Sequence, residues 1–299
     1  MPTRLILDTD IGTDVDDCLA LAVILGSPEI ELVGVTCVYG DVALRGRMVR
    51  KLLRLKRRDD VPVYLGADDS LLGLRPIHWP GHEGVGLLEE SDEGLEPTPG
   101  RAVDFIVESV MANPGQIHLL AIGPLTNVAI ALKVEPRIAE RLAHLTIMGG
   151  VRHSARTIAE HNIVCDPEAA QIVVSSGAPT TLVPLDVTLR VTIDQVGVEQ
   201  VRRAGTPFHD AVARQVELYP RFRERGTTYL HDPLAAAIVV RPELATLTSL
   251  RVDVETGGRL SAGASLMREP SVDTPANAAV ALDVDVAAAE AFIIERIAN

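Results

Sequence analysis

An acidic run between two apolar segments near the N-terminus is the feature that most constrains the fold. Residues 5–7 are apolar, five of the ten residues 8–17 are aspartates, and residues 19–23 are apolar again. This order predicts a strand, an acidic turn and a helix. Because open α/β sheets bind their ligands beside the carboxyl ends of strands, the turn is also a predicted ligand site.

The composition of the turn favours a bound metal ion. The carboxylates of Asp8, Asp10, Asp14, Asp16 and Asp17 repel one another, and their pKa values would rise unless a cation or many hydrogen-bond donors held the charged forms. Oxygen-only ligation favours Ca²⁺ or Mg²⁺, because residues 8–17 include no histidine or cysteine to offer the nitrogen or sulfur that zinc prefers. A solvated acidic loop that caps the next helix is the alternative, but one or two aspartates would satisfy it.

The composition of the chain predicts a soluble, cytoplasmic globular protein. With 299 residues, of which 47% are hydrophobic, the chain can bury a sizeable core. The longest apolar stretch, residues 18–25, is too short to cross a membrane, and the N-terminus lacks the order of a signal peptide. A net charge of -13 disfavours nucleic acid and anionic membranes as partners, and 3% aromatic residues leave little material for stacking bases. A small neutral substrate fits better.

Three cysteines, Cys18, Cys37 and Cys165, are widely spaced and belong to no paired motif. Neither a disulfide framework nor a zinc cluster is therefore indicated. We expect these residues to be buried thiols.

Apolar strand-like runs alternate with stretches of helical spacing along most of the chain. The strand-like runs are residues 32–38, 61–65, 117–122, 145–148 and 180–183. The helical stretches include residues 42–55, 102–111 and 167–174. This alternation predicts an α/β fold with a largely parallel central sheet flanked by helices. Because no internal repeat or low-complexity linker is visible, we expect a single domain over residues 1–299.

The remaining segments have less regular patterns. Residues 66–99 are rich in glycine, proline and acidic residues, and a loop of this length inside a compact domain is usually functional or mobile. The pattern is helical from Asp194 to Phe222. Residues 247–286 indicate short strands and turns, and residues 287–297 a final helix.

Three polar motifs each have a purely structural interpretation. In the motif 231–233, Asp232 can be an N-cap and Pro233 the first residue of a helix. Residues 123–127 indicate a turn from a strand into a helix. Residues 160–168 combine Glu160-His161-Asn162 with another proline-started helix, and a carboxylate beside an amide could equally bind sugar hydroxyls.

Taken together, these motifs resemble the nucleoside hydrolases, the inosine-uridine preferring N-ribosyl hydrolase family. Residues 8–17 look like the acidic signature of that family in an extended variant, with two more residues between the glycine and the final aspartate pair. Six further motifs match in the expected order: Gly81-His82-Glu83-Gly84, Gly123-Pro124-Leu125-Thr126-Asn127, Met148-Gly149-Gly150, Ala159-Glu160-His161-Asn162, Asp166-Pro167-Glu168-Ala169-Ala170 and His231-Asp232-Pro233. The resemblance implies a nucleoside hydrolase-like α/β domain.

The resemblance implies a Ca²⁺ site and a general base. Asp10, Asp17, the main-chain carbonyl of Thr126 and the side chain of Asp232 match the residues that hold the ion together with water. Asp14, in the lengthened turn, has no sure counterpart, and we include it as a further candidate ligand. Asp10 is also implied as the general base.

Other matches imply a substrate pocket. Asp16 matches a residue that binds ribose hydroxyls, and Glu160 and Asn162 match the residues that grip the ribose. Met148 lies where a side chain packs against the sugar. His82 matches a histidine in the pocket for the base.

The chain departs from the common family pattern at four positions. Asp41 stands where many members have asparagine, which predicts a differently charged contact near the ribose or base. His161 replaces an aromatic residue, and the asparagine expected near Ser154 is missing, so contacts to the ribose 5′-hydroxyl are open. Tyr229 lies two residues before His231, where it can line the base pocket or simply pack.

The implied activity is Ca²⁺-dependent hydrolysis of the N-glycosidic bond of ribonucleosides to free base and ribose, an enzyme of nucleoside metabolism. A histidine near its ordinary pKa of about 6.5 can protonate the departing base, and His231 is the candidate for this acid. The resemblance suggests a homodimer or homotetramer. The sequence leaves the preferred base open.

Two alternatives remain at this point. A phosphatase of the haloacid dehalogenase type would use the pair Asp8 and Asp10, but Gly12 stands where that family expects threonine or valine, and no convincing downstream lysine motif follows. A non-catalytic, Ca²⁺-dependent nucleoside or sugar binder would keep the pocket without the chemistry. An assay for released ribose separates the enzyme from the binder.

Overall fold

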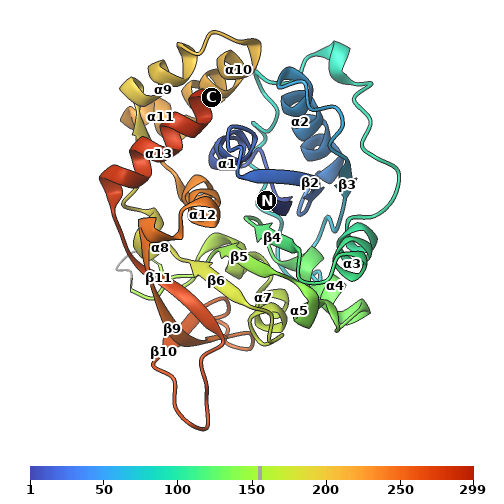
Figure 1. Cartoon of the computed structure of the whole chain (residues 1–299), viewed down its shortest axis with the longest axis vertical. Coiled ribbons are helices and arrows are strands. Elements are labelled where there is room, and N and C mark those ends of the chain that lie inside the picture. The colour runs from blue at the N-terminus through green and yellow to red at the C-terminus, as the bar shows by residue number, and fades with distance from the viewer. Residues whose placement is uncertain (154–156) are drawn as a thin grey trace.

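The computed structural model describes residues 1–153 and 157–299 of the chain. Within these residues, nine strands form one mixed, mostly parallel sheet in the order β10-β9-β11-β6-β5-β4-β1-β2-β3 (Figure 1). These strands are β1 (Thr3–Thr9), β2 (Ile30–Cys37), β3 (Val63–Leu65), β4 (Ile117–Ala121), β5 (His144–Met148), β6 (Thr180–Val183), β9 (Ala245–Val254), β10 (Ser265–Arg268) and β11 (Ala278–Val284). Away from this sheet, β7 (Thr192–Asp194) pairs antiparallel with β8 (Thr227–Tyr229). The predicted α/β fold is confirmed.

Strand β1 lies inside the sheet, paired in parallel with β2 on one side and with β4 on the other. Its apolar residues 5–7 are completely buried, because both faces of the strand are covered. Near its end, Asp8 is aligned with Thr36 of β2 and with Ala121 of β4. The acidic turn that follows β1 therefore leaves the sheet at its carboxyl edge, between two neighbouring parallel strands.

Helices cover both faces of the sheet (Figure 1). One hydrophobic cluster joins the sheet to α1 (Asp16–Leu25), α2 (Val42–Leu55), α8 (Leu185–Thr188), α9 (Gln195–Arg202), α10 (Pro207–Leu218), α11 (Pro220–Arg225), α12 (His231–Val240) and α13 (Val286–Ala298). A second cluster joins it to α3 (Ala102–Ala112), α4 (Thr126–Val134), α5 (Ile138–Arg141) and α7 (Pro167–Val174). Helix α1 is buried along almost its whole length because it also packs against α12 and α13.

Several element boundaries follow the sequence pattern. The helices α2 and α7 and the strand β6 begin and end at the predicted residues. The helical region after Asp194 divides into α9, α10 and α11. The C-terminal region differs from a set of short strands, because β9 is ten residues long and pairs antiparallel with both β11 and β10.

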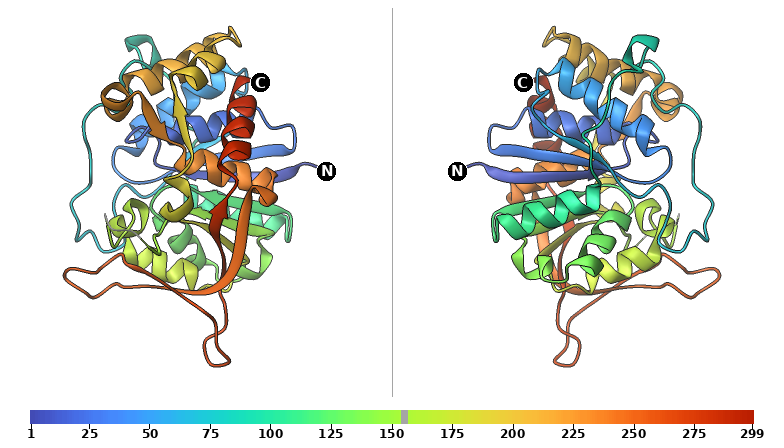
Figure 2. Two further views of the ribbon diagram at one scale, coloured as in Figure 1. Left: turned by 90° about the vertical axis from the view of Figure 1, so that its left-hand side faces the viewer. Right: turned by 90° about the vertical axis from the view of Figure 1, so that its right-hand side faces the viewer.

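Three long connections among the described residues lie outside the layers. Residues 66–99 run along one side of the molecule as a mostly irregular trace, interrupted by the 3₁₀ turn Glu90–Asp92 (Figure 2). This confirms the predicted loop. The loops that flank β10, residues 255–264 and 269–277, project from the body at the end of the sheet (Figure 2). A second 3₁₀ turn, Pro242–Leu244, links α12 to β9.

Two further sequence expectations concern thiols and membranes. Cys18, Cys37 and Cys165 are buried free thiols, as predicted. Among the helices of the described residues, none has both the length and the apolar character needed to cross a membrane.

A pair of histidines on β4 and β5 makes a testable contribution to acid stability. His118 Nε2 lies 2.9 Å from Thr146 Oγ1, and the rings of His118 and His144 are 5.2 Å apart. Burial, with a further contribution from His144, lowers the pKa of His118 to about 3. The unfolded chain, with an ordinary histidine pKa of about 6.5, therefore binds this proton first, and the folded state loses stability as the pH falls below that value.

We expect His118→Gln, which keeps a hydrogen-bonding side chain beside Thr146, to remove this pH dependence. Between about pH 7 and about pH 4.5, the wild type should lose roughly 2–3 kcal/mol more free energy of unfolding than the variant does. Urea unfolding at the two pH values measures the difference. Equal losses in both proteins would show that His118 does not titrate in this way.

Candidate functional site

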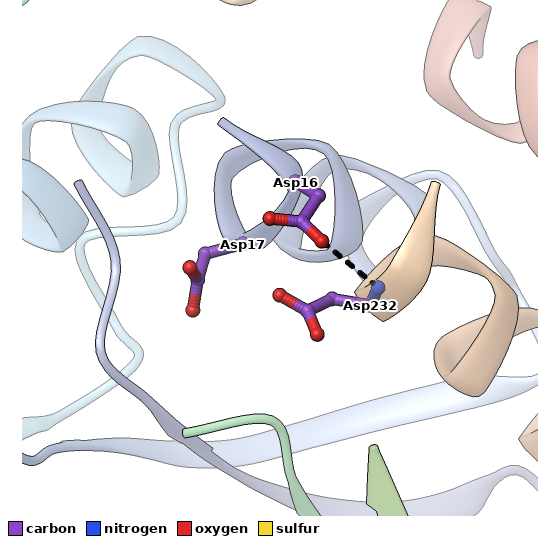
Figure 3. A group of neighbouring side chains, drawn as sticks. All are labelled: Asp16, Asp17 and Asp232. Atoms are coloured by element: carbon purple, nitrogen blue, oxygen red, sulfur yellow. Dashed lines mark hydrogen bonds between the residues drawn. The ribbon is translucent and has the colours of Figure 1, made fainter. Parts of the chain in front are cut away.

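Three buried carboxylates meet at the carboxyl edge of the sheet. Oxygen atoms of Asp16, Asp17 and Asp232 lie within 4.8 Å of one another (Figure 3). The backbone N–H of Asp232 donates a hydrogen bond of 3.3 Å to Asp16 Oδ2. We call Asp16, Asp17 and Asp232 the aspartate cluster.

The aspartate cluster stands at the N-terminal ends of two packed helices. Asp16 and Asp17 occupy the first turn of α1, and Asp232 occupies the first turn of α12. Carboxylates in these positions interact favourably with the positive ends of the helix dipoles. The predicted N-cap role of Asp232 is wrong, because α12 begins one residue earlier, at His231, and the N-cap position is Leu230. The Asp232 side chain is thereby left for the cluster.

The electrostatics of the cluster suit a cation. Burial raises the pKa of Asp16, Asp17 and Asp232 well above the ordinary value, and the neighbouring carboxylates raise each of them further. A donor set made only of carboxylate oxygens matches hard divalent ions such as Ca²⁺ and Mg²⁺. The cluster is therefore consistent with a metal site.

Asp10 lies beside the cluster and directly follows β1. It is buried, and its charge raises the pKa values of Asp17 and Asp232. Burial raises the pKa of Asp10 itself, while the charge of Arg45 acts in the opposite direction. Gly12 permits the turn because its φ of 120° is one that other residues avoid.

Arg45 is a fully buried cation whose hydrogen bonds hold the acidic turn in place. Its guanidinium donates to the main-chain oxygens of Asp10 and Ile11, the latter at 2.7 Å, and to Thr13 Oγ1 at 3.1 Å. Its Nε donates to the main-chain oxygen of Tyr39 at 2.6 Å. A single side chain on α2 thus joins the turn after β1 to the turn after β2.

The loop 66–99 covers this arginine. The guanidinium carbon of Arg45 lies 5.0 Å from the ring centroid of Trp79. Because the charge is buried and its donors are occupied by the acidic turn, Arg45 supplies fixed positive charge to the neighbouring aspartates.

Sequence reasoning missed Arg45, although a signal was present. The buried face of α2 carries Arg45, Met48, Val49, Leu52 and Leu53, with the spacing of one helical stripe. An arginine within an apolar stripe indicates a buried cation, and a buried cation needs oxygen partners.

A cavity of about 670 Å³ opens above the aspartate cluster. Most of the predicted site residues line it: Asp10, Asp14, Asp16, Asp17, His82, Met148, Glu160, Asn162, His231 and Asp232. The lining also includes residues that were not predicted, among them His78, Tyr219, Arg221 and Arg225. The predicted residues therefore come from five separate regions of the chain to one place.

One end of the cavity is formed by Glu160, Asn162 and Met148, held by a network of hydrogen bonds. Glu160 is the N-cap of α6 (His161–Cys165) and accepts from the backbone N–H groups of Asn162, Ile163 and Gly150. Asn162 Nδ2 donates to the main-chain oxygen of Met148 at 3.2 Å. The predicted capped helix start therefore also forms part of the cavity wall.

His161 lines the cavity nearby, with its ring 5.6 Å from that of His78. Ser154 lies outside the described residues.

The other end of the cavity contains His231 and α11. Thr188 Oγ1 and His231 Nδ1 form a hydrogen bond of 2.7 Å. The ring nitrogen that remains available to a ligand is therefore Nε2. Burial lowers the pKa of His231 to about 4, with Arg221 lowering it further and Asp14 opposing the change. The ordinary histidine pKa assumed from the sequence is therefore not retained, and the ring is neutral at neutral pH.

Asp14 connects the acidic turn to the helices above it. Its Oδ1 accepts from the backbone N–H of Val15 at 2.6 Å, and its Oδ2 accepts from the hydroxyl of Tyr219 at 2.7 Å. His82 Nε2 lies 3.0 Å from the main-chain oxygen of Thr13. Both oxygens of Asp14 are thus engaged, and the aspartate cluster forms without it.

Three predicted residues are not among the described residues that line the cavity. Asp41 is exposed and caps α2 by accepting from the backbone N–H of Leu44. Thr126 begins α4, and its hydroxyl donates to Asp166 Oδ2 at 2.7 Å. Tyr229 does not line the cavity, but its ring lies 5.3 Å from that of His231.

Similarity to known proteins extends over nearly the whole chain. The family model described as inosine-uridine preferring nucleoside hydrolase matches residues 5–291. The inosine-uridine preferring nucleoside hydrolase of Leishmania major is 34% identical over 281 residues, which cover 89% of this chain and 88% of that protein. The structure of a plant nucleoside hydrolase, the PpNRh1 enzyme, matches with a TM-score of 0.89 and 30% identity over 99% of both chains. That of a purine-preferring ribonucleoside hydrolase from Gardnerella vaginalis matches with a TM-score of 0.88 and 32% identity over 99% of this chain and 98% of the other.

The contacts of Arg45 predict that its shape matters as well as its charge. We expect Arg45→Lys to lower the free energy of unfolding by about 2–4 kcal/mol, because lysine keeps the charge but cannot reach these oxygens with a planar fork. Arg54→Lys, on the same helix but with a side chain that is 57% exposed, is the matched control and should change it by less than about 0.5 kcal/mol. Urea unfolding measures both. Similar losses would contradict the role given to Arg45.

Proposed function

The chain belongs to the inosine-uridine preferring nucleoside hydrolase family, and from this premise we propose that it hydrolyses the N-glycosidic bond of ribonucleosides with a bound Ca²⁺, giving free base and ribose. The observation that carries the proposal is the group of buried carboxylates at the floor of a cavity of about 670 Å³. Cleavage of such a bond passes through an oxocarbenium-like transition state, which negative charge around the sugar stabilises.

For the ion, we propose Asp10, Asp17 and Asp232 as carboxylate ligands, together with the main-chain carbonyl of Thr126. Asp16, which shares the aspartate cluster, is proposed to accept from a ribose hydroxyl. When bound, the ion would act as a Lewis acid that lowers the pKa of a water molecule and helps to hold the sugar hydroxyls. The all-oxygen donor set supports Ca²⁺.

Asp10 is our candidate for the general base. Its burial raises its pKa, which strengthens it as a proton acceptor, and the fixed charge of Arg45 favours its ionised form. Arg45 also holds the main chain of Asp10 and so restricts where the carboxylate can lie. In the proposed reaction, a water molecule bonds to C1′ of the sugar and passes a proton to Asp10.

We propose that the sugar lies between the aspartate cluster and the end of the cavity that contains Glu160, Asn162 and Met148. Backbone donors fix Glu160, and the main-chain oxygens of Met148 and Ile122 fix Asn162. Side chains held in this way can bind hydroxyls without losing further conformational freedom.

The base is proposed to occupy the end that contains His82 and His231, with Tyr229 supporting His231 from behind. Because the ring of His231 is neutral, it would donate a hydrogen bond to the departing base from Nε2 rather than act as a charged acid. The relatives' names include both inosine-uridine and purine preference, so the preferred base is an experimental question.

Family membership favours this proposal over a phosphatase of the haloacid dehalogenase type. A non-catalytic nucleoside binder is the remaining alternative, and a product assay separates the two.

For assembly, we propose a homodimer or homotetramer, supported by the exposed apolar side chains of Leu260, Leu266 and Val272 on and around the projecting strand β10. Light scattering of the purified protein tests this.

The deciding experiment for function is incubation with inosine, uridine, cytidine and adenosine in the presence of Ca²⁺, with free ribose as the readout. We expect ribose from at least one of them. Binding of nucleosides without any release of ribose would support the non-catalytic alternative.

Asp10→Asn should lower kcat by about 10²–10⁴-fold, the usual contribution of a general base. The amide still accepts hydrogen bonds but does not take up the proton of water at neutral pH. Steady-state kinetics on the best nucleoside measures the change, and circular dichroism checks the fold. A variant within about tenfold of the wild type, roughly 1.4 kcal/mol in barrier, would assign the base to another group.

Removal of the ion should abolish activity and lower the stability of the folded state. A ligand that binds only the folded state stabilises it by about 2.7 kcal/mol when the free ligand concentration is 100 times the Kd. We expect Asp17→Asn to lose this stabilisation by Ca²⁺ while its chelated form is at least as stable as the chelated wild type, since one like charge is removed. Asp41→Asn, at an exposed cap that asparagine serves equally well, is the matched control. Thermal denaturation with and without Ca²⁺ measures all three proteins, and an unchanged Ca²⁺ response of Asp17→Asn would contradict the assignment.

A further inference from the structure

The arginines that line the cavity come from a single helix. Carboxylates form the floor, whereas α11 contributes Arg221, Glu224 and Arg225 to the wall near His231. Arg225 is exposed, but Arg221 is partly buried. Arg221 is close enough to His231 and Tyr219 for its charge to lower the pKa of each. The arginines of the lining thus lie at the end of the cavity proposed above for the base.

The guanidinium of Arg221 is held in place by stacking. Its central carbon lies 5.4 Å from the centroid of the Tyr229 ring, and that ring lies 5.3 Å from the ring of His231. Helix α11 packs on β8, the strand that ends at Tyr229, and thereby fixes the relative positions of the two residues. Stacking occupies the face of a guanidinium and leaves its N–H groups, which lie in the plane, free to donate.

Within residues 1–153 and 157–299, the N–H groups of Arg221 have no hydrogen-bond acceptor in the protein. No carboxylate of these residues lies within 4.0 Å of the guanidinium. Two other partly buried arginines, Arg202 and Arg251, are paired with Glu217 at 2.8 Å and with Asp253 at 2.7 Å. A partly buried arginine without an acceptor, directed at a cavity, calls for a ligand that carries negative charge or a carbonyl oxygen.

The proposed reaction produces such a ligand. When the bond between C1′ and the base nitrogen breaks, both electrons pass to that nitrogen, and the base leaves as an anion unless it is protonated. In a base with a carbonyl group, such as hypoxanthine or uracil, the charge spreads to the carbonyl oxygen. The anion afterwards takes up the proton that water gave to Asp10, which completes free base and ribose.

We propose that Arg221 is a catalytic residue that binds the carbonyl oxygen of the departing base and stabilises its anion, and that it thereby selects bases with a carbonyl group over bases with an amino group. This inference rests on the proposed function. A guanidinium cannot give up its proton in a protein, so Arg221 acts by charge and hydrogen bonding and not as an acid. A fixed donor aimed at developing negative charge contributes to the transition state more than to substrate binding.

Inosine and adenosine test the selection because they differ at one position of the base, where inosine has a carbonyl and adenosine an amino group. The amino group is a donor and cannot accept from the guanidinium. We expect the wild type to favour inosine by roughly 10²-fold in kcat/KM, as for a site built around one such hydrogen bond.

Arg221→Met removes the charge and the donors but keeps a long side chain. It should lower kcat/KM for inosine by about 10²–10³-fold and adenosine far less, so that the preference largely disappears. A p-nitrophenyl riboside, whose leaving group is already a stable anion, should be almost unaffected, which also shows that the variant is folded. Arg221→Lys should recover part of the rate on inosine. Arg223→Met, an exposed arginine on the same helix, is the matched control and should behave as the wild type.

Two outcomes would overturn the inference in distinguishable ways. If Arg221→Met slows inosine, adenosine and the p-nitrophenyl riboside equally, or if the wild type prefers adenosine, Arg221 does not stabilise the departing base. If the wild type releases ribose from none of these substrates, nor from uridine or cytidine, the proposed function itself is wrong, and the inference falls with it.

Discussion

The burial of several like charges at one place is the constraint on which the rest of the structure depends. Asp10, Asp16, Asp17 and Asp232 are all buried, and each is raised in pKa by burial and by its neighbours. Such a group destabilises a fold unless positive charge surrounds it. The chain provides this charge in two fixed forms, the N-terminal ends of α1 and α12 and the guanidinium of Arg45. The cluster is in addition consistent with a metal site.

The contacts that compensate the buried negative charge of the floor also organise the cavity above it. Arg45 ties the acidic turn to the turn after β2, and Asp14 ties the same turn to Tyr219 at the start of α11. Helix α11 in turn carries Arg221, so the cavity has a negative floor and an arginine in its wall. A nucleoside hydrolase needs this polarity, because bond cleavage leaves positive charge on the sugar and negative charge on the base.

The sequence predicted the parts of this arrangement that depend on local pattern. Apolar strands, the proline-started helix α7 and the acidic turn are visible as periodicity and turn chemistry, and the ordered motifs brought most of the cavity lining together. Three features escaped because they depend on tertiary contacts. Asp232 was expected to be an N-cap, but the helix starts one residue earlier. Arg45 was overlooked because a charged residue on a helix is normally solvated, and the pKa of His231 follows from burial that no local pattern reveals.

We propose above that a divalent cation completes the aspartate cluster. Diffraction from crystals grown with Ca²⁺, measured at a wavelength where calcium scatters anomalously, tests it most directly. We expect one strong anomalous peak per chain, within coordination distance of carboxylate oxygens of the cluster. A structure in which the carboxylates of Asp16, Asp17 and Asp232 hydrogen-bond only to one another and to water, with no such peak, would contradict it.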